Sequence, residues 1–163
     1  MGQQRMTQAL PTEIEHKYLL SGVPPRVEGA PSKTLRQGYL PGEVLVERVR
    51  HISTAEGDTY VRTVKAGTGV ERIELEEECD AALFEALWAL TGDCQIAKVR
   101  YLVPDGELTW EVDVFTDREL VLAEIEVPTA DTVVVFPDWL APYVVREGTS
   151  ELAYTNWQLS KQP

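Results

Sequence analysis

Charged and apolar side chains alternate along many short segments of this chain, and this alternation restricts the available folds more than any other feature. Successive side chains on a β-strand point to opposite faces of the sheet, so strict alternation gives a strand one ionic face and one apolar face. Near the start of the chain, Glu13, Glu15 and Lys17 share one face. Ile14 and Tyr18 lie on the opposite face. Such segments are predicted to be strands.

The same pattern recurs along most of the sequence and predicts about eight strands. The segments have the length of strands and are rich in Val, Ile, Thr and Tyr. They are Glu13–Leu20, Thr34–Leu40, Leu45–Ile52, Thr59–Lys65, Glu71–Glu78, Gln95–Val103, Leu108–Thr116 and Val121–Pro128. Ala66–Gly69 and Pro104–Gly106 have the composition of hairpin turns. Consecutive strands with short turns imply an antiparallel sheet, and closure into a barrel would remove its edges.

Three segments are predicted to be helical. In Asp80–Thr91 the apolar residues recur at helical spacing, with Asp80 as the N-cap and Gly92 as the stop. Asp138–Val145 is predicted as a second helix and Leu152–Leu159 as a short third one. One helix lies in mid-chain and the others near the end, among mostly consecutive strands, and the predicted fold class is α+β.

The ionic faces allow two interpretations. An antiparallel sheet ordinarily turns its polar face to water and its apolar face to a core. Here, however, the charges are segregated by strand, since Arg48 and Arg50 form a purely basic face and Glu124 and Glu126 a purely acidic one. Like charges two residues apart repel each other, and the centres of these faces carry almost no Ser, Thr, Gln or Asn. A site with a cationic wall and a carboxylate wall explains this arrangement better than a solvated surface.

A polyphosphate bound with a divalent metal ion is the ligand that suits such a site. Arginine and lysine bind phosphate oxygens, and carboxylates bind Mg²⁺ or Mn²⁺. The predicted fold is therefore an eight-stranded antiparallel β-barrel, a tunnel with a charged interior and helices packed outside it. Arg62, on the face opposite Lys65, is expected to point away from the site.

The bulk composition excludes several classes of function. A net charge of −12 argues against binding of nucleic acid. No apolar run is long enough to cross a membrane, and two cysteines are too few for a disulfide framework, so a cytoplasmic protein is expected. Residues 1–12 are predicted to be a flexible N-terminal tail and residues 13–163 a single domain. A homodimer stays open, because no feature of the sequence requires one.

Taken in order, the strand motifs resemble the CYTH superfamily, the triphosphate tunnel metalloenzymes. Glu13-Ile14-Glu15-His16-Lys17 matches the N-terminal Glu-x-Glu-x-Lys signature of that family. The segments that look like its later motifs are Gln37–Leu40, Arg48–Arg50, Tyr60–Lys65, Arg72–Glu76, Lys98–Tyr101, Glu111–Phe115 and Glu124–Glu126. The resemblance covers the chain from Thr12 to Asn156.

The resemblance implies a tunnel that hydrolyses or cyclises triphosphates with Mg²⁺ or Mn²⁺, and it assigns roles by position. The residues that match the phosphate-binding residues of the family are Lys17, Arg48, Arg50, Lys65, Arg72, Lys98 and Arg100. Those that match carboxylates binding metal or orienting the attacking water are Glu13, Glu15, Asp113, Glu124 and Glu126. Glu13, Glu15 and Lys17 are the expected catalytic residues, and Glu74, Glu76 and Glu111 are further candidates.

The expected activity is hydrolysis of inorganic tripolyphosphate to pyrophosphate and phosphate, because the sequence shows no set of residues suited to reading a purine. The alternatives are a thiamine triphosphatase, a class IV-type adenylate cyclase and a non-catalytic module that binds polyphosphate or nucleotides. Retention of every expected carboxylate argues against the binding module. Ala153 stands where the family would place an arginine, and this departure keeps the module open.

Overall fold

The computed structural model describes residues 12–40, 42, 45–66 and 71–162, with the side chains of Glu71, Arg72 and Leu152 left out. The strands are β1 (Thr12–Leu20), β2 (Ser32–Leu40), β3 (Val46–Thr54), β4 (Gly57–Ala66), β5 (Glu71–Cys79), β6 (Gln95–Asp105), β7 (Leu108–Phe115), β8 (Val121–Glu126) and β9 (Val144–Glu147). The α-helices are α1 (Ala81–Trp88) and α2 (Asn156–Ser160), and the 3₁₀ helices are η1 (Pro25–Val27), η2 (Ala141–Tyr143) and η3 (Leu152–Tyr154).

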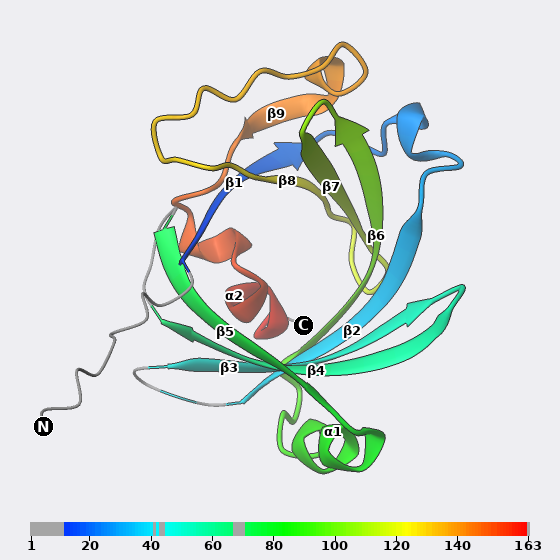
Figure 1. The fold of residues 1–163 in the computed structure, drawn as a ribbon, viewed down its shortest axis with the longest axis vertical. Coiled ribbons are helices and arrows are strands. Elements are labelled where there is room, and N and C mark those ends of the chain that lie inside the picture. The colour runs from blue at the N-terminus through cyan, green and yellow to red at the C-terminus, as the bar shows by residue number, and fades with distance from the viewer. Residues whose placement is uncertain (1–11, 41, 43–44, 67–70, 163) are drawn as a thin grey trace, which may run out of the picture.

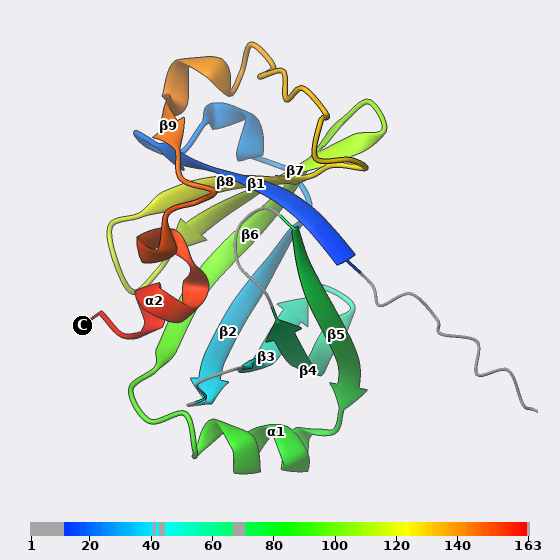
Figure 2. The same ribbon diagram turned by 90° about the vertical axis from the view of Figure 1, so that its left-hand side faces the viewer.

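The strands form one antiparallel sheet that closes on itself (Figures 1 and 2). Its order is β5-β4-β3-β2-β6-β7-β8-β1-β9, and a short pairing of β1 with β5 completes the ring. In that seam Thr12, Glu13 and Ile14 lie opposite residues 71–73 of β5. The predicted eight-stranded antiparallel barrel is thus confirmed, and β9 is an additional strand on the edge of β1.

Two groups of apolar residues cover the outside of the barrel. The outer face of β1, β7 and β8 packs against the segment that leads to β9, as in the contact of Tyr18 with Phe136, whose ring centroids are 4.8 Å apart. Trp110 and Leu140 are fully buried in the same layer. On the other side, α1 lies against β3 and β4 through the buried Phe84. The larger hydrophobic cluster therefore lies outside the barrel wall. A smaller one, Ile96, Phe115, Leu122 and Leu159, lies where α2 packs, and the cavity is lined mainly by charged side chains.

The N-cap and the glycine stop predicted for α1 are both present in the structure. The carboxylate of Asp80 accepts a hydrogen bond of 2.7 Å from the backbone N–H of Leu83, which caps the helix as predicted. Gly92 follows the helix with a φ of +57°, a conformation that favours glycine. The hairpin predicted at residues 66–69 lies largely outside the described residues, whereas the one at Gly106 is present, with a φ of +63° at that glycine.

The helix predicted over Asp138–Val145 is wrong. This segment contains only the short η2 and then enters β9. Pro142 has no N–H to donate within a longer helix, and Val144 and Val145 favour an extended backbone. The helix predicted over Leu152–Leu159 is divided into η3 and α2, because Thr155 is extended and caps α2.

Within the described residues, the structure contains no helix with both the length and the apolar character needed to span a bilayer.

Candidate active site

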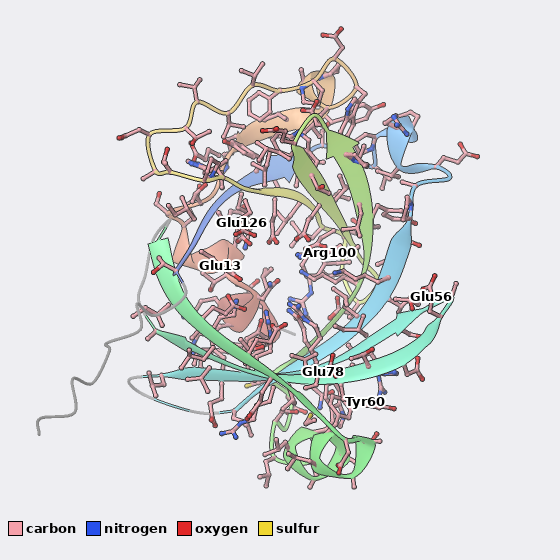
Figure 3. The ribbon with its side chains drawn as sticks, viewed as in Figure 1. Glu13, Glu56, Tyr60, Glu78, Arg100 and Glu126 are labelled. Carbon is pink, nitrogen blue, oxygen red and sulfur yellow. The ribbon has the colours of Figure 1, made fainter. Side chains whose placement is uncertain are left out.

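A cavity of about 920 Å³ occupies the barrel interior. Figure 3 shows Glu13, Glu126 and Arg100 pointing into it, whereas Glu56 lies on the outer surface. The predicted site residues whose side chains line the cavity are Glu13, Glu15, Lys17, Arg48, Arg50, Lys65, Glu74, Glu76, Arg100, Glu111, Glu124 and Glu126. Residues predicted from seven separate segments are therefore brought together in one space.

Of three further predicted site residues, two lie buried in the barrel wall and one is described only by its backbone. Lys98 and Asp113 are both fully buried in the wall, where they form an ion pair with each other. The backbone of Arg72 lies opposite Glu13 in the seam between β5 and β1, and its side chain is not among those described. Arg62 points away from the cavity as predicted, and pairs with Glu47 at 2.7 Å.

Arg100 is the most heavily paired cation of the described part of the wall. Its Nε and Nη2 donate hydrogen bonds of 2.6 Å to the two carboxylate oxygens of Asp113. Nη2 also lies 2.6 Å from Glu124, and Nη1 pairs with Glu111. Burial alone would lower the pKa of Arg100, but Asp113 and Glu124 outweigh burial and raise that pKa well above its usual value.

Lys17 joins the cationic and acidic walls. Its Nζ lies 2.8 Å from Oε1 of Glu124 and 3.8 Å from Glu15. Burial opposes ionisation of Glu124, but Lys17 and Arg100 hold the pKa of this carboxyl well below its usual range. Lys98 and Arg100 likewise lower the pKa of the buried Asp113. Glu124 and Asp113 are therefore charged at neutral pH. Burial lowers the pKa of Lys98 itself to about 8.

A second ionic group lies across the tunnel on β3, β4 and β5. Nη2 of Arg48 lies 3.1 Å from Glu74 and 3.3 Å from Glu76, and Nζ of Lys65 lies 2.6 Å from Glu74. Glu74 also shares a side-chain hydrogen bond with Glu13. Burial, together with this bond to Glu74 and its charge, raises the pKa of Glu13 to about 7.

Arg50 differs from the other predicted cations, because no ion pair holds its guanidinium among the described side chains. Its Nε donates a hydrogen bond of 2.9 Å to Oε1 of Gln37, whose Nε2 donates to the hydroxyl of Tyr39 at 3.1 Å. Burial and the neighbouring charges of Arg48 and Arg100 lower the pKa of Arg50 to about 10, so it remains charged at neutral pH. Arg50 is thus a cation of the cavity lining without an ion-pair partner among the described side chains.

The carboxylates near the β1–β8 pair suit a divalent metal ion. Glu15 and Glu126 lie directly opposite each other in the register of these strands. Two like charges in this position repel, and a cation between them would remove that repulsion. The described residues contain no ready-made group of three His, Cys, Asp or Glu side chains that could hold a metal. This is compatible with Mg²⁺, which takes one or two carboxylates and completes its shell with waters and phosphate oxygens.

The segment after β9 contributes residues that the sequence interpretation did not single out. The ring of Trp157 lies 5.7 Å from that of Tyr39, and Oδ1 of Asn156 lies 3.4 Å from Nζ of Lys98. Trp157, Asn156 and Thr149 all line the cavity, and α2 lies across one end of the barrel (Figure 1). An amphipathic strand pattern could not reveal them, because Asn156 and Trp157 lie in a short helix and Thr149 in a turn. Lys33, on β2, also lines the cavity and was missed.

Comparison with known proteins supports the resemblance drawn from the motifs. No family model matches the chain. An inorganic triphosphatase from Acetivibrio thermocellus is 34% identical over 160 residues, which are 93% of this chain and 94% of that protein.

Two solved structures share the architecture. That of the inorganic triphosphatase NE1496 has a TM-score of 0.65 and 28% identity, and covers 94% of this chain and 97% of its own. The PH1819 protein from Pyrococcus horikoshii OT3 shares the fold, with a TM-score of 0.55 and 19% identity over 77% of this chain and 80% of its own. With a charged tunnel and a relative that matches almost its whole length, this chain belongs to the inorganic triphosphatases of the CYTH superfamily.

Proposed function

We propose that this protein hydrolyses inorganic tripolyphosphate to pyrophosphate and phosphate in a metal-dependent reaction. The observation that carries the proposal is that lysine, arginine and carboxylate side chains together line one cavity inside the barrel. The relative from Acetivibrio thermocellus is named an inorganic triphosphatase, which supports the same substrate. Both cysteines are free thiols, as the reducing cytoplasm in which we place the protein would keep them.

The lysine and arginine side chains of the lining would hold the phosphate chain. Arg50 is the first candidate, because its guanidinium has no carboxylate partner within the described residues. Arg48, Lys65 and Lys17 line the same cavity and would exchange part of their carboxylate contacts for phosphate oxygens. Lys98 lies beneath the surface of the wall and acts on the site through Asp113. For Arg72, the proposed role rests on the resemblance and on its backbone position opposite Glu13.

The carboxylates present fit Mg²⁺ or Mn²⁺. Glu15, Glu126 and Glu124 would hold the ion, with Glu13 beside them. Oε1 of Glu124 is buried and lies 2.8 Å from Nζ of Lys17, so a bound ion would share this carboxylate with that ammonium group. A bound divalent ion neutralises charge on the phosphate oxygens and so assists attack on phosphorus.

The residues of the chain would carry out the remaining steps. Glu13 and Glu15 orient a water molecule toward the terminal phosphorus, and Glu13, with a pKa of about 7, accepts a proton from it near neutral pH. The bond from phosphorus to the bridging oxygen breaks, and pyrophosphate leaves. Lys17 offsets the charge that develops on the phosphate oxygens during this transfer, when positioning and charge neutralisation matter most.

Phosphate release from tripolyphosphate, ATP and thiamine triphosphate, with Mg²⁺ or Mn²⁺, tests the proposal. We expect release from tripolyphosphate that depends on the metal and falls at least ~100-fold in Glu15→Gln, which corresponds to ~3 kcal/mol of barrier lowering. Glu56→Gln is the matched control, because Glu56 lies in the exposed β3–β4 turn outside the tunnel (Figure 3).

The other outcomes separate the alternatives. Tight binding of tripolyphosphate without release would indicate the non-catalytic module. Formation of cyclic AMP from ATP would indicate a cyclase, and a preference for thiamine triphosphate would change the substrate. An equal loss of activity in Glu15→Gln and Glu56→Gln would contradict a catalytic role for Glu15.

A further inference from the structure

Lys33 is a cation of the tunnel wall that the proposed reaction does not use. It lies on β2, directly opposite Arg100 in the register of β2 and β6, so the two side chains share the inner face. Its side chain is half-buried and lines the same cavity. In its strand it follows Pro31 and Ser32 and precedes apolar Leu35, so no run of charge marked it in the sequence.

Lys33 has no counterion of its own. No hydrogen bond or ion pair of its ammonium group is found within the described part of the chain. The carboxylates whose charges reach it, Glu111 and Asp113, are both already paired with Arg100. Arg100 therefore pairs with both nearby carboxylates. Lys33, like Arg50, has no ion-pair partner among the described side chains.

This arrangement is unfavourable in the empty tunnel. Burial lowers the pKa of Lys33, and the positive charges of Arg100 and Arg50 act in the same direction, against the opposing charges of Glu111 and Asp113. A partly desolvated ammonium group whose neighbouring carboxylates are already paired is not fully compensated by the protein itself. An anion in the cavity would supply the missing partner, so the position of Lys33 is explained if it binds a ligand.

Lys33 lies toward the end of the tunnel that α2 does not cover. Tyr39, which contacts Trp157 of α2, is six residues further along β2, and six residues of strand span about 20 Å. The lining residues Leu108 and Thr109 come from the start of β7, beside the β6–β7 turn. Figure 2 shows this turn and α2 at opposite ends of the barrel. A substrate with an organic group would have to place that group at the uncovered end.

We propose that Lys33 binds the phosphate that lies nearest the uncovered end of the tunnel and favours inorganic tripolyphosphate over esterified triphosphates. The inference rests on the proposed function. A free terminal phosphate carries a charge of about −1.5 to −2 at neutral pH, whereas the esterified phosphate of a nucleotide carries a single charge. An unpaired ammonium group at this position therefore interacts more strongly with the inorganic chain.

The experiment compares wild type with Lys33→Met, Lys33→Arg and a control, Arg26→Met. Arg26 is an exposed cation of η1, so its replacement removes the same charge far from the cavity lining. We expect Lys33→Met to raise KM for tripolyphosphate about tenfold with kcat changed less than about threefold, as for a lost binding contact. KM for ATP should rise no more than about threefold. Lys33→Arg should restore most of the affinity, and Arg26→Met should behave as wild type.

Thermal stabilisation by tripolyphosphate and by ATP, measured on the same variants, detects binding independently of turnover. It keeps the inference testable if wild type releases no phosphate, a result that would count against the proposed function alone. The ligand-free Lys33→Met variant should melt no lower than wild type, because it loses an unpaired charge rather than a contact. The inference is overturned if Lys33→Met leaves tripolyphosphate affinity within twofold of wild type, if both ligands lose affinity equally, or if Arg26→Met gives the same loss.

Discussion

Arg50 and Arg100 project into the same cavity, but the protein holds them in different ways. Arg100 is paired with Asp113, Glu124 and Glu111, whereas Arg50 donates its described hydrogen bond to the neutral Gln37. Removing a cation from a buried network leaves uncompensated carboxylates, while removing an unpaired cation leaves none. The two arginines should therefore differ in their effects on stability even where both bind phosphate.

Substitution of these arginines by Met tests this difference. We expect Arg100→Met to lower the free energy of unfolding by about 3–5 kcal/mol, since Asp113 and Glu124 stay buried with fewer partners. Arg50→Met should cost less, about 1–3 kcal/mol, because it leaves only the buried Oε1 of Gln37 without its donor, and yet weaken tripolyphosphate binding. Urea unfolding of the ligand-free variants measures the first effect and calorimetric titration the second. Equal destabilisation by the two substitutions would contradict this account.

Glu13 gives a pH-dependent prediction. Its pKa is raised from 4.5 to about 7 by burial and by Glu74, so between these pH values the folded chain holds a proton that the unfolded chain has released. This contribution to stability is complete below about pH 4.5 and is lost as the pH rises toward 7. Glu13→Gln can still donate a hydrogen bond to Glu74 and does not titrate.

We therefore expect wild type to lose stability relative to Glu13→Gln as the pH rises from about 5 to about 8 in metal-free buffer. Urea unfolding of both proteins at each pH measures the change, and the comparison cancels the contributions of the other carboxylates. A stability difference that stays constant with pH, or that changes in the opposite direction, would rule out the raised pKa.

At the scale of single residues, alternation predicted which side chains face inward but not how they pair. Glu74 was a doubtful candidate from the sequence, because its contacts with Arg48 and Lys65 depend on the register of three strands. Gln37 and Lys33 lie among uncharged or apolar inner residues, so the pattern gave no reason to select them. Their roles depend on residues of the neighbouring strands, since Gln37 bonds to Arg50 of β3 and Lys33 lies opposite Arg100 of β6.

Among the elements, β9 was the main omission from the predicted fold. Residues 144–147 resemble any short extended segment, and their pairing with β1 follows from an unoccupied strand edge rather than from their own pattern. The segment then continues along β1 through Thr149. The backbone N–H of Lys17 donates to Oγ1 of Thr149 at 2.9 Å, and that hydroxyl donates to Glu147 at 2.7 Å.

Thr149→Val should show how much this connection contributes. The substitution leaves the backbone N–H of Lys17 without its partner in a partly buried position, which costs about 1–3 kcal/mol of unfolding free energy. Thr132→Val is the control, because its hydroxyl meets only Thr129 on an exposed loop, and a change within about 0.5 kcal/mol is expected there. Urea unfolding measures both. A loss no larger in Thr149→Val than in the control would show that the hydroxyl does not support this strand edge.

At the scale of the whole molecule, the chain has a net charge of −12, and yet six lysine and arginine side chains line the tunnel. Tripolyphosphate with Mg²⁺ should therefore stabilise the fold strongly. At a ligand concentration of 100 times Kd the gain is about 2.7 kcal/mol, or roughly 5–10 °C in Tm for a chain of this size. Differential scanning fluorimetry with NaCl at matched ionic strength as the control measures the shift. A shift equal to that of NaCl would contradict a built anion site.

Closure of the sheet and the inward ionic faces could be predicted from the sequence, because alternation fixes both. The manner of closure could not. Only Thr12, Glu13 and Ile14 of β1 pair with β5, while Tyr18, Leu19 and Leu20 pair with β9 on the same strand edge. Dividing one edge between two partners requires knowledge of strand tilt and register, which a single sequence does not contain.

This divided edge has a consequence for biosynthesis. β1 is translated before the other described strands and pairs with β8 along one edge and with β5 and β9 along the other, so two of its partners are made after β7. Pairing over such sequence separations is slow, because a long loop must close before the contacts form. In a nascent chain that stops before β8, the strand with the Glu-x-Glu-x-Lys signature lacks its partners β8 and β9. Assembly of the proposed site carboxylates, which include Glu124 and Glu126 of β8, therefore has to follow translation of β8.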